Sequence, residues 1–136
     1  MNNPKAAIVI VDDEVILLMS IRQQLRIKFG PDILYETAIS AEKGLEKIDE
    51  LTSRGVSLVL VISDWLMPGM KGDEFLKIVH ENHPVVKLLM ISGHADSEAM
   101  EDLNKTAPLH GFLRKPYSNN NLFSMVESAL HEAEVL

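Results

Sequence analysis

The most informative stretch of the sequence is Leu58-Val59-Leu60-Val61-Ile62-Ser63-Asp64-Trp65-Leu66-Met67-Pro68-Gly69. It begins as a short, unbroken apolar run rich in β-branched side chains and ends in turn-forming residues. This pattern is typical of a strand buried on both faces, as in parallel sheets. Asp64 is the first residue past the expected strand, and open α/β sheets bind their ligands in the crevice outside the carboxyl ends of the strands. Asp64 is therefore the first candidate for a functional site.

Composition and charge narrow the classes of protein. The 136 residues, 46% hydrophobic and 24% charged, suit one globular domain over residues 1–136 and argue against disorder. The net charge of −7, without a basic cluster, argues against nucleic-acid binding by this domain. The chain has no cysteine, no signal-peptide layout at its start and no apolar run near the ~18 residues of a membrane span. We therefore expect a cytoplasmic protein without a membrane partner.

Strands and helices are predicted to alternate along the whole chain. Continuous apolar runs predict strands at residues 6–11 and 58–63, and further strands are predicted at residues 33–37, 87–91 and 111–114. The predicted helices are one ending at Gly30-Pro31 and four beginning near Ser40, Asp73-Glu74, Asp96 or Ser97, and Ser118. Right-handed crossovers place such helices on both faces of a sheet. The expected fold class is therefore α/β, with a doubly wound, five-stranded parallel sheet.

The expected carboxyl ends of the strands carry a set of polar side chains: Asp12, Asp13, Asp64, Ser92 and Lys115. If the first and third strands are neighbours, the three carboxylates come together at a topological switch point. Two carboxylates about 5 Å apart at an effective dielectric constant of about 20 repel by about 3 kcal/mol. A hard divalent cation such as Mg²⁺ removes this repulsion. The Ser92 hydroxyl and the Lys115 ammonium group suit a phosphoryl group, which a carboxylate can accept covalently.

These motifs resemble the receiver domain of two-component response regulators, of the chemotaxis-regulator type. The resemblance rests on Asp12-Asp13, the block Asp64-Trp65-Leu66-Met67-Pro68-Gly69-Met70-Lys71-Gly72, Ser92-Gly93, and Lys115-Pro116 with Phe112 just upstream. It covers essentially the whole chain, and the motifs follow the family's order at the expected strand ends. It implies a flavodoxin-like sheet with the strand order 2-1-3-4-5.

The resemblance assigns the acidic residues to phosphorylation and metal binding. Asp64 would be the phosphoacceptor. Asp13 and Asp64 would bind Mg²⁺ directly, together with the backbone carbonyl of Leu66, and Asp12 would act through a metal-bound water. Leu66 stands where many members of the family carry a polar side chain that holds the attacking water, so we hypothesise that it slows loss of the phosphoryl group. His94 occupies another position that tunes this step.

The resemblance also implies a conformational switch. Ser92 would hydrogen-bond the phosphoryl group, Lys115 would pair with it, and the ring of Phe112 would turn inward as the Ser92 hydroxyl moves. Pro116 would follow a cis peptide bond. The last strand and its flanks lack the acidic and basic pairing with which winged-helix regulators dimerise, so we expect a monomer or a weak dimer.

The implied function is phosphorylation-dependent signalling without dedicated substrate turnover. A histidine kinase or a phosphotransfer protein would phosphorylate Asp64, and a changed face of the fourth helix, fifth strand and fifth helix would bind a downstream protein or output domain. One alternative is a haloacid-dehalogenase-like, Mg²⁺-dependent phosphatase. That class places its nucleophile in a D-x-D motif after the first strand, where this chain has Asp12-Asp13-Glu14. A second alternative is a pseudo-receiver that binds partners without phosphorylation.

Several side chains outside this set also carry predictions. Trp65 is expected to be partly exposed, His110 and His131 are expected at the surface, and Asp13 or Glu14 is expected to cap the first helix. That helix has more apolar residues than one face requires, which favours either a docking surface for a partner helix or a broad core contact. The additional apolar residues are Ile16, Leu17 and Met19.

Overall fold

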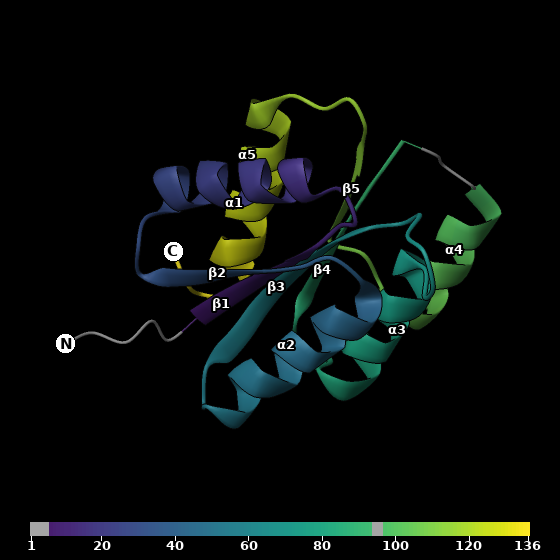
Figure 1. Cartoon of the computed structure of the whole chain (residues 1–136), viewed down its shortest axis with the longest axis horizontal. Coiled ribbons are helices and arrows are strands. Elements are labelled where there is room, and N and C mark those ends of the chain that lie inside the picture. The colour runs from purple at the N-terminus through teal and green to yellow at the C-terminus, as the bar shows by residue number, and fades with distance from the viewer. Residues whose placement is uncertain (1–5, 94–96) are drawn as a thin grey trace.

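Strands and helices alternate along the chain in the computed structural model, which describes residues 6–93 and 97–136 (Figure 1). The strands are β1 (Ala6–Val11), β2 (Ile33–Ala38), β3 (Ser57–Asp64), β4 (Lys87–Ser92) and β5 (Gly111–Arg114). The helices are α1 (Val15–Phe29), α2 (Ala41–Ser53), α3 (Gly72–Asn82), α4 (Ser97–Thr106) and α5 (Asn119–Glu132). All the predicted elements are present. Of the two caps expected for α4, Asp96 lies outside the described residues, as does His94, and Ser97 is the first residue of the helix.

The five strands form one parallel sheet in the order β2-β1-β3-β4-β5. This order and the helices on both faces confirm the predicted fold class. Because β1 and β3 are neighbours while their following connections lead to opposite sides of the sheet, the switch point lies between their carboxyl ends. Val11 of β1 pairs with Ser63 of β3. The next residues along each strand, Asp12 and Asp64, are therefore brought to the same place on the sheet edge.

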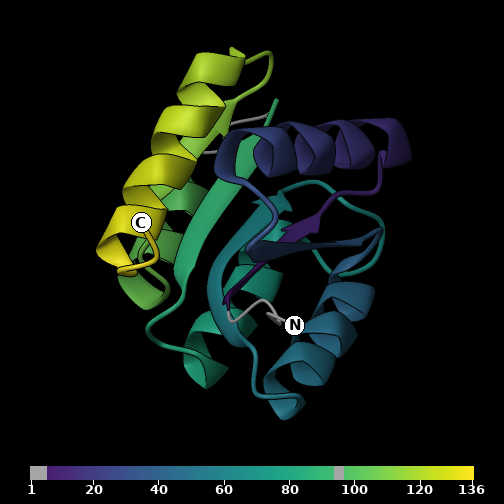
Figure 2. The ribbon, with the colours of Figure 1, turned by 90° about the vertical axis from the view of Figure 1, so that its left-hand side faces the viewer.

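Each face of the sheet is covered by its own apolar layer. α1 and α5 pack on one face, and α2, α3 and α4 pack on the other (Figures 1 and 2). The side chains of β1 alternate between the layers, with Ile8 and Ile10 on the α1 and α5 side and Val9 and Val11 on the other. Full burial of one such side chain contributes about 1.5–3 kcal/mol. The continuous apolar runs therefore hold the sheet between two layers of helices.

Three strands extend one residue beyond the predicted ends. β2 reaches Ala38, β3 reaches Asp64 and β4 reaches Ser92. The extension arises because the pairing of the strands continues, with Asp64 opposite Ile91 and Ser92 opposite Arg114. Asp64 and Ser92 are thus the last residues of strands, and the sheet holds their backbones.

The start of α1 differs from the prediction. Glu14 occupies the N-cap position, yet within the described residues its side chain makes no capping hydrogen bond. Asp12 accepts the hydrogen bond of the Glu14 N–H instead, with 2.9 Å between the nitrogen and Oδ1. Glu14 therefore takes the predicted N-cap position, but the capping hydrogen bond expected from a side chain there is not formed in the part of the chain that the structure describes.

The apolar residues of α1 divide into two groups. Leu18, Ile21 and Leu25 are buried in the core, and Leu17 packs partly against it. Ile16 and Met19 are exposed, Ile16 to 87%. A broad core contact is therefore wrong for Ile16 and Met19, and their role in docking stays a prediction. None of the helices within the described ranges is long and apolar enough to cross a membrane.

Two side chains are more buried than predicted. Trp65 is only 7% exposed and belongs to the apolar layer under α2, α3 and α4, because it continues the alternation of β3 on the same face as Val61. The side chain of His110 is 13% exposed, since its ring nitrogens lie 3.1 Å from Ser128 Oγ and 3.4 Å from Glu132 Oε2. The prediction for His131 is confirmed, as its side chain is 60% exposed.

Candidate functional site

Three carboxylates meet at the switch point between β1 and β3. Asp12 follows β1 and is 3% exposed, Asp64 ends β3 and is 7% exposed, and Asp13 is exposed. One oxygen from each of the three lies within 4.8 Å of the others. The strand order thus produces the acidic cluster that the sequence predicts. Among the described residues this is the one group of three or more such side chains with a spacing that suits a metal ion.

Lys115 brings a positive charge to this cluster from the end of the edge strand β5. Its Nζ lies 3.4 Å from Asp12 Oδ2 and 3.6 Å from Asp64 Oδ2. Lys115 directly follows β5, and its backbone N–H donates to the carbonyl oxygen of Ser92 at 3.0 Å. The peptide bond between Lys115 and Pro116 is cis, as the family resemblance implies. The ammonium group therefore spans the end of β4 to reach both buried carboxylates.

Burial governs the ionisation of the two inner carboxylates. The pKa of Asp64 is raised from 3.8 to about 6, chiefly by burial and next by the negative charge of Asp12. The positive charge of Lys115 and a 2.8 Å hydrogen bond from the Trp65 N–H to Asp64 Oδ1 act in the opposite direction on this pKa. Burial also raises the pKa of Asp12. Near neutral pH the cluster therefore holds negative charge that one ammonium group does not balance.

The donor set fits a hard divalent cation. All three side chains offer carboxylate oxygens, which Mg²⁺ prefers, and the exposed Asp13 leaves room for the waters that Mg²⁺ retains. A cation would also relieve the repulsion that raises the pKa of Asp64. The backbone of Leu66, the further ligand implied by the family resemblance, lies two residues beyond Asp64 in the loop between β3 and α3.

The remaining predicted residues surround the carboxylates. Ser92 is 1% exposed at the end of β4, one residue beyond Ile91, which pairs with Asp64. Phe112 lies on β5 opposite Met90 and packs partly against the layer under α2, α3 and α4. The side chain of Leu66 is 43% exposed. The structure therefore places every predicted site residue at the carboxyl edge of the sheet except Phe112, which lies within β5.

Tyr117 is a neighbour of the site that sequence patterns did not indicate. Its side chain packs partly against the layer under α1 and α5. Burial, and then the negative charge of Asp12, raise the pKa of its phenol. In the sequence, Tyr117 is connected with the site only by its position two residues after Lys115. An aromatic residue at that position carries no chemical signal by itself.

Comparison with known proteins identifies the family. A family model described as the response regulator receiver domain matches residues 8–127. The chain belongs to this family. Receiver domains are regulatory phosphoacceptors and not dedicated enzymes, so membership removes the support for a haloacid-dehalogenase-like phosphatase.

Individual relatives of this receiver domain agree with the assignment. Sensor kinase CckA of Brucella abortus is 31% identical over 98 residues, which are 72% of this chain and 10% of that protein. Transcriptional regulatory protein FixJ of Bradyrhizobium diazoefficiens is 35% identical over 80 residues, 59% of this chain and 38% of that protein. The chain thus spans at most 38% of either relative. A CheY-like receiver domain protein from Methanospirillum hungatei is 29% identical with a TM-score of 0.82, over 95% of this chain and 96% of that one.

Proposed function

We propose that this receiver domain accepts a phosphoryl group on Asp64 and thereby changes a binding surface. The observation that carries the proposal is the convergence of Asp12, Asp13 and Asp64 with Lys115 at the switch point of the sheet. A histidine kinase or a phosphotransfer protein would be the donor. A downstream protein or output domain would read the changed surface. We take residues 1–136 as one domain that works in the cytoplasm as a monomer or weak dimer.

Mg²⁺ is the proposed cofactor. Asp13 and Asp64 would hold it directly with the backbone carbonyl of Leu66, and Asp12 would hold it through a water. When bound, Mg²⁺ neutralises the carboxylates and attracts the oxygens of the incoming phosphoryl group. The raised pKa of Asp64 supports this assignment, because the ionised site is short of positive charge.

Asp64 supplies the nucleophile for the transfer. Its Oδ1 accepts a hydrogen bond from the Trp65 N–H, and its Oδ2 lies on the side of Lys115. In the transfer a carboxylate oxygen forms the new O–P bond while the N–P bond of the donor histidine breaks, and the imidazole nitrogen keeps the electron pair. Lys115 and the Ser92 hydroxyl would then hold the phosphoryl oxygens.

The new charge would move the β5 side of the sheet. A phosphoryl group adds a charge of about −1.5 to −2 near neutral pH. It competes with Asp12 for Lys115, whose backbone N–H is bonded to the carbonyl of Ser92. Any shift of Lys115 is therefore shared with the end of β4 and with β5, which carries Phe112. Through this coupling, phosphorylation would bias the face formed by α4, β5 and α5 between two conformations.

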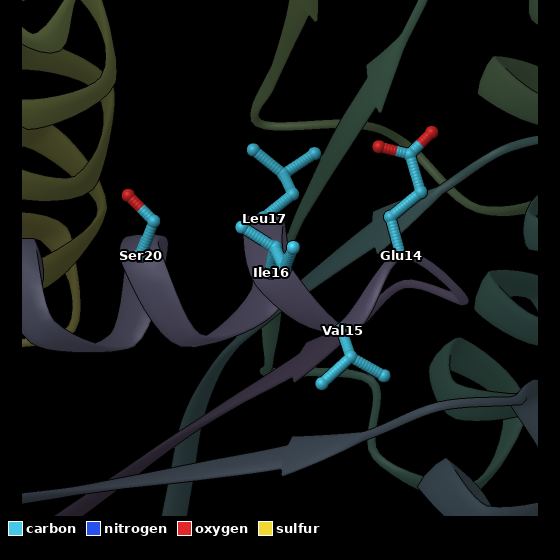
Figure 3. Close-up of a pocket in the computed structure, with 5 residues that line it drawn as sticks. All are labelled: Glu14, Val15, Ile16, Leu17 and Ser20. Carbon is cyan, nitrogen blue, oxygen red and sulfur yellow. The ribbon is translucent and has the colours of Figure 1, made fainter.

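The exposed start of α1 supports a protein donor. Glu14, Val15, Ile16, Leu17 and Ser20 line a hollow there, directly after the acidic pair. Figure 3 shows Ile16 and Leu17 pointing to one side of the helix and Val15 to the other. An apolar helix face that contributes little to the core is suited to an amphipathic partner helix. We propose that the donor docks here, within reach of Asp64.

Intact mass measurement tests the proposal. The protein is incubated with acetyl phosphate and Mg²⁺, and Asp64→Asn and a sample with EDTA serve as controls. We expect the mass of one phosphoryl group to be gained by the wild type with Mg²⁺ and by neither control. A wild type that gains no mass, and that also forms no complex with beryllofluoride, would support the pseudo-receiver alternative.

A further inference from the structure

The loop between β3 and α3 follows Asp64 directly and carries the backbone carbonyl of Leu66. We propose that this loop is anchored at two points, by Gly72 at its end and by Glu42 at its tip, and that both are positioning residues for the Mg²⁺ and phosphoryl site. The inference rests on the proposed function, since it concerns the geometry of the same site. Neither residue has a side chain among the three carboxylates.

Gly72 lies against the backbone of Asp64. Its N–H donates to the carbonyl oxygen of Trp65 at 2.8 Å, which closes the loop. A Cβ atom at position 72 would overlap the carbonyl oxygen of Asp64 and would lie 2.9 Å from the Cα of Trp65. These are backbone atoms, which cannot rotate away as the end of a side chain can. The absence of a side chain at Gly72 is therefore what permits the first turn of α3 to pack on the end of β3.

The packing of α3 decides where a methyl group at Gly72 would be accommodated. Phe75 and Leu76, in the first turns of the helix, are fully buried under the sheet. Moving the helix would disturb this core, which tolerates volume changes poorly. The end of β3 is held by its pairing with β1 and β4, so the displacement falls most easily on the loop. The loop carries the Leu66 carbonyl and begins directly after Asp64.

Glu42 holds the tip of the same loop. Its Oε1 accepts a hydrogen bond from the Met70 N–H, with 3.3 Å between the two atoms. The adjoining Gly69 has a φ of +82°, a left-handed conformation that turns the chain at this point. Glu42 is in the first turn of α2, where the Ser40 hydroxyl accepts from the Lys43 N–H at 3.1 Å. The capped start of α2 thus provides a firm support for the loop.

The Gly72 anchor is tested with Gly72→Ala against Gly111→Ala. A Cβ at Gly111 would crowd only side-chain atoms, Met125 Sδ at 2.9 Å and Leu89 Cδ1 at 3.1 Å, at the far end of β5. Both substitutions are expected to lower the urea concentration at the midpoint of unfolding. Calorimetry should show Mg²⁺ binding weakened by about tenfold or more in Gly72→Ala, the range for residues that orient metal ligands, and unchanged in Gly111→Ala. A folded Gly72→Ala protein with wild-type Mg²⁺ affinity would overturn the role of Gly72.

The Glu42 anchor is tested with a pair of variants that carry the same charge. Glu42→Gln and Glu42→Ala both remove the carboxylate charge, but only glutamine keeps an acceptor for the Met70 N–H. In metal-free protein we expect faster amide hydrogen exchange at Met70 in Glu42→Ala, and about two- to fivefold weaker Mg²⁺ binding, as for loss of one hydrogen bond. Glu42→Gln should retain wild-type values. Equal values in the two variants would refute the anchor, and this pair decides the proposal if Gly72→Ala does not fold.

These measurements separate the anchors from the proposed function. Mg²⁺ affinity and amide exchange require no phosphorylation, so they report on the loop alone. A wild type that binds Mg²⁺ yet neither gains a phosphoryl group nor forms a complex with beryllofluoride contradicts the proposed function, while the variant pairs still decide the anchors. A wild type that is phosphorylated, with variants that match their controls, supports the proposed function and overturns the anchors.

Discussion

Replacing Asp64 by asparagine is expected to stabilise the metal-free protein near neutral pH. The pKa of Asp64 is raised from 3.8 to about 6 by burial and by the charge of Asp12. A carboxyl group with a higher pKa in the folded state makes a contribution to stability that is fully present below pH 3.8 and is lost as the pH rises through about 6. The shift of about two units corresponds to about 3 kcal/mol at pH 7.5. Asparagine is uncharged, so this penalty disappears, and its carbonyl oxygen can still accept from the Trp65 N–H.

Urea unfolding in EDTA measures this difference. The unfolding free energy of Asp64→Asn should exceed that of the wild type by up to about 3 kcal/mol at pH 7.5 and by about 1 kcal/mol at pH 4.5. Asp49→Asn, on the exposed surface of α2, is the control for loss of one negative charge and should change little. Saturating Mg²⁺ should stabilise the wild type more than Asp64→Asn and narrow the gap. A gap that is absent at pH 7.5, or that widens as the pH falls, would refute the conclusion that burial and the charge of Asp12 penalise the ionised Asp64.

Three further outcomes are expected. Leu66→Asn should shorten the lifetime of the phosphorylated protein, followed as decay of the mass adduct, because the exposed apolar side chain holds no water for attack; an unchanged lifetime would contradict this. Ile16→Ser should slow phosphorylation by a histidine-containing donor protein but not by acetyl phosphate, and equal slowing with both would count against docking on α1. In Tyr117→Phe protein, Tyr35 is the remaining tyrosine, and tyrosinate absorbance should appear only when the pH is well above 10. The reason is that burial raises the pKa of Tyr35 to about 12. The contribution of Tyr35 to stability is then fully present below pH 10 and is lost as the pH rises through about 12. Ionisation of Tyr35 near pH 10 in the folded protein would exclude this raised pKa.

Local patterns in the sequence were enough to predict the elements and the acidic residues at the strand ends. Apolar runs mark the five strands because parallel strands are buried on both faces, and the polar residues at their ends mark the edge where ligands bind. The strand order came from the family resemblance, and the structure has the same order. The errors concern individual side chains. Trp65, predicted to be partly exposed, is buried because it keeps the alternation of β3 one residue past the end of the strand, and His110, predicted at the surface, is held by α5.

The sequence by itself determined which residues stand at the carboxyl ends of the strands, because that information is contained in the period and length of each apolar run. Only the tertiary structure decided which distant groups come into contact. Lys115 meets Asp12 across 103 positions of sequence and Glu42 meets Met70 across 28. Neither contact is encoded in a local pattern, because each depends on the crossovers that order the strands and on the packing of helices against them. The raised pKa of Asp64 has the same origin, since burial and a neighbouring carboxylate exist only once β1 and β3 lie side by side.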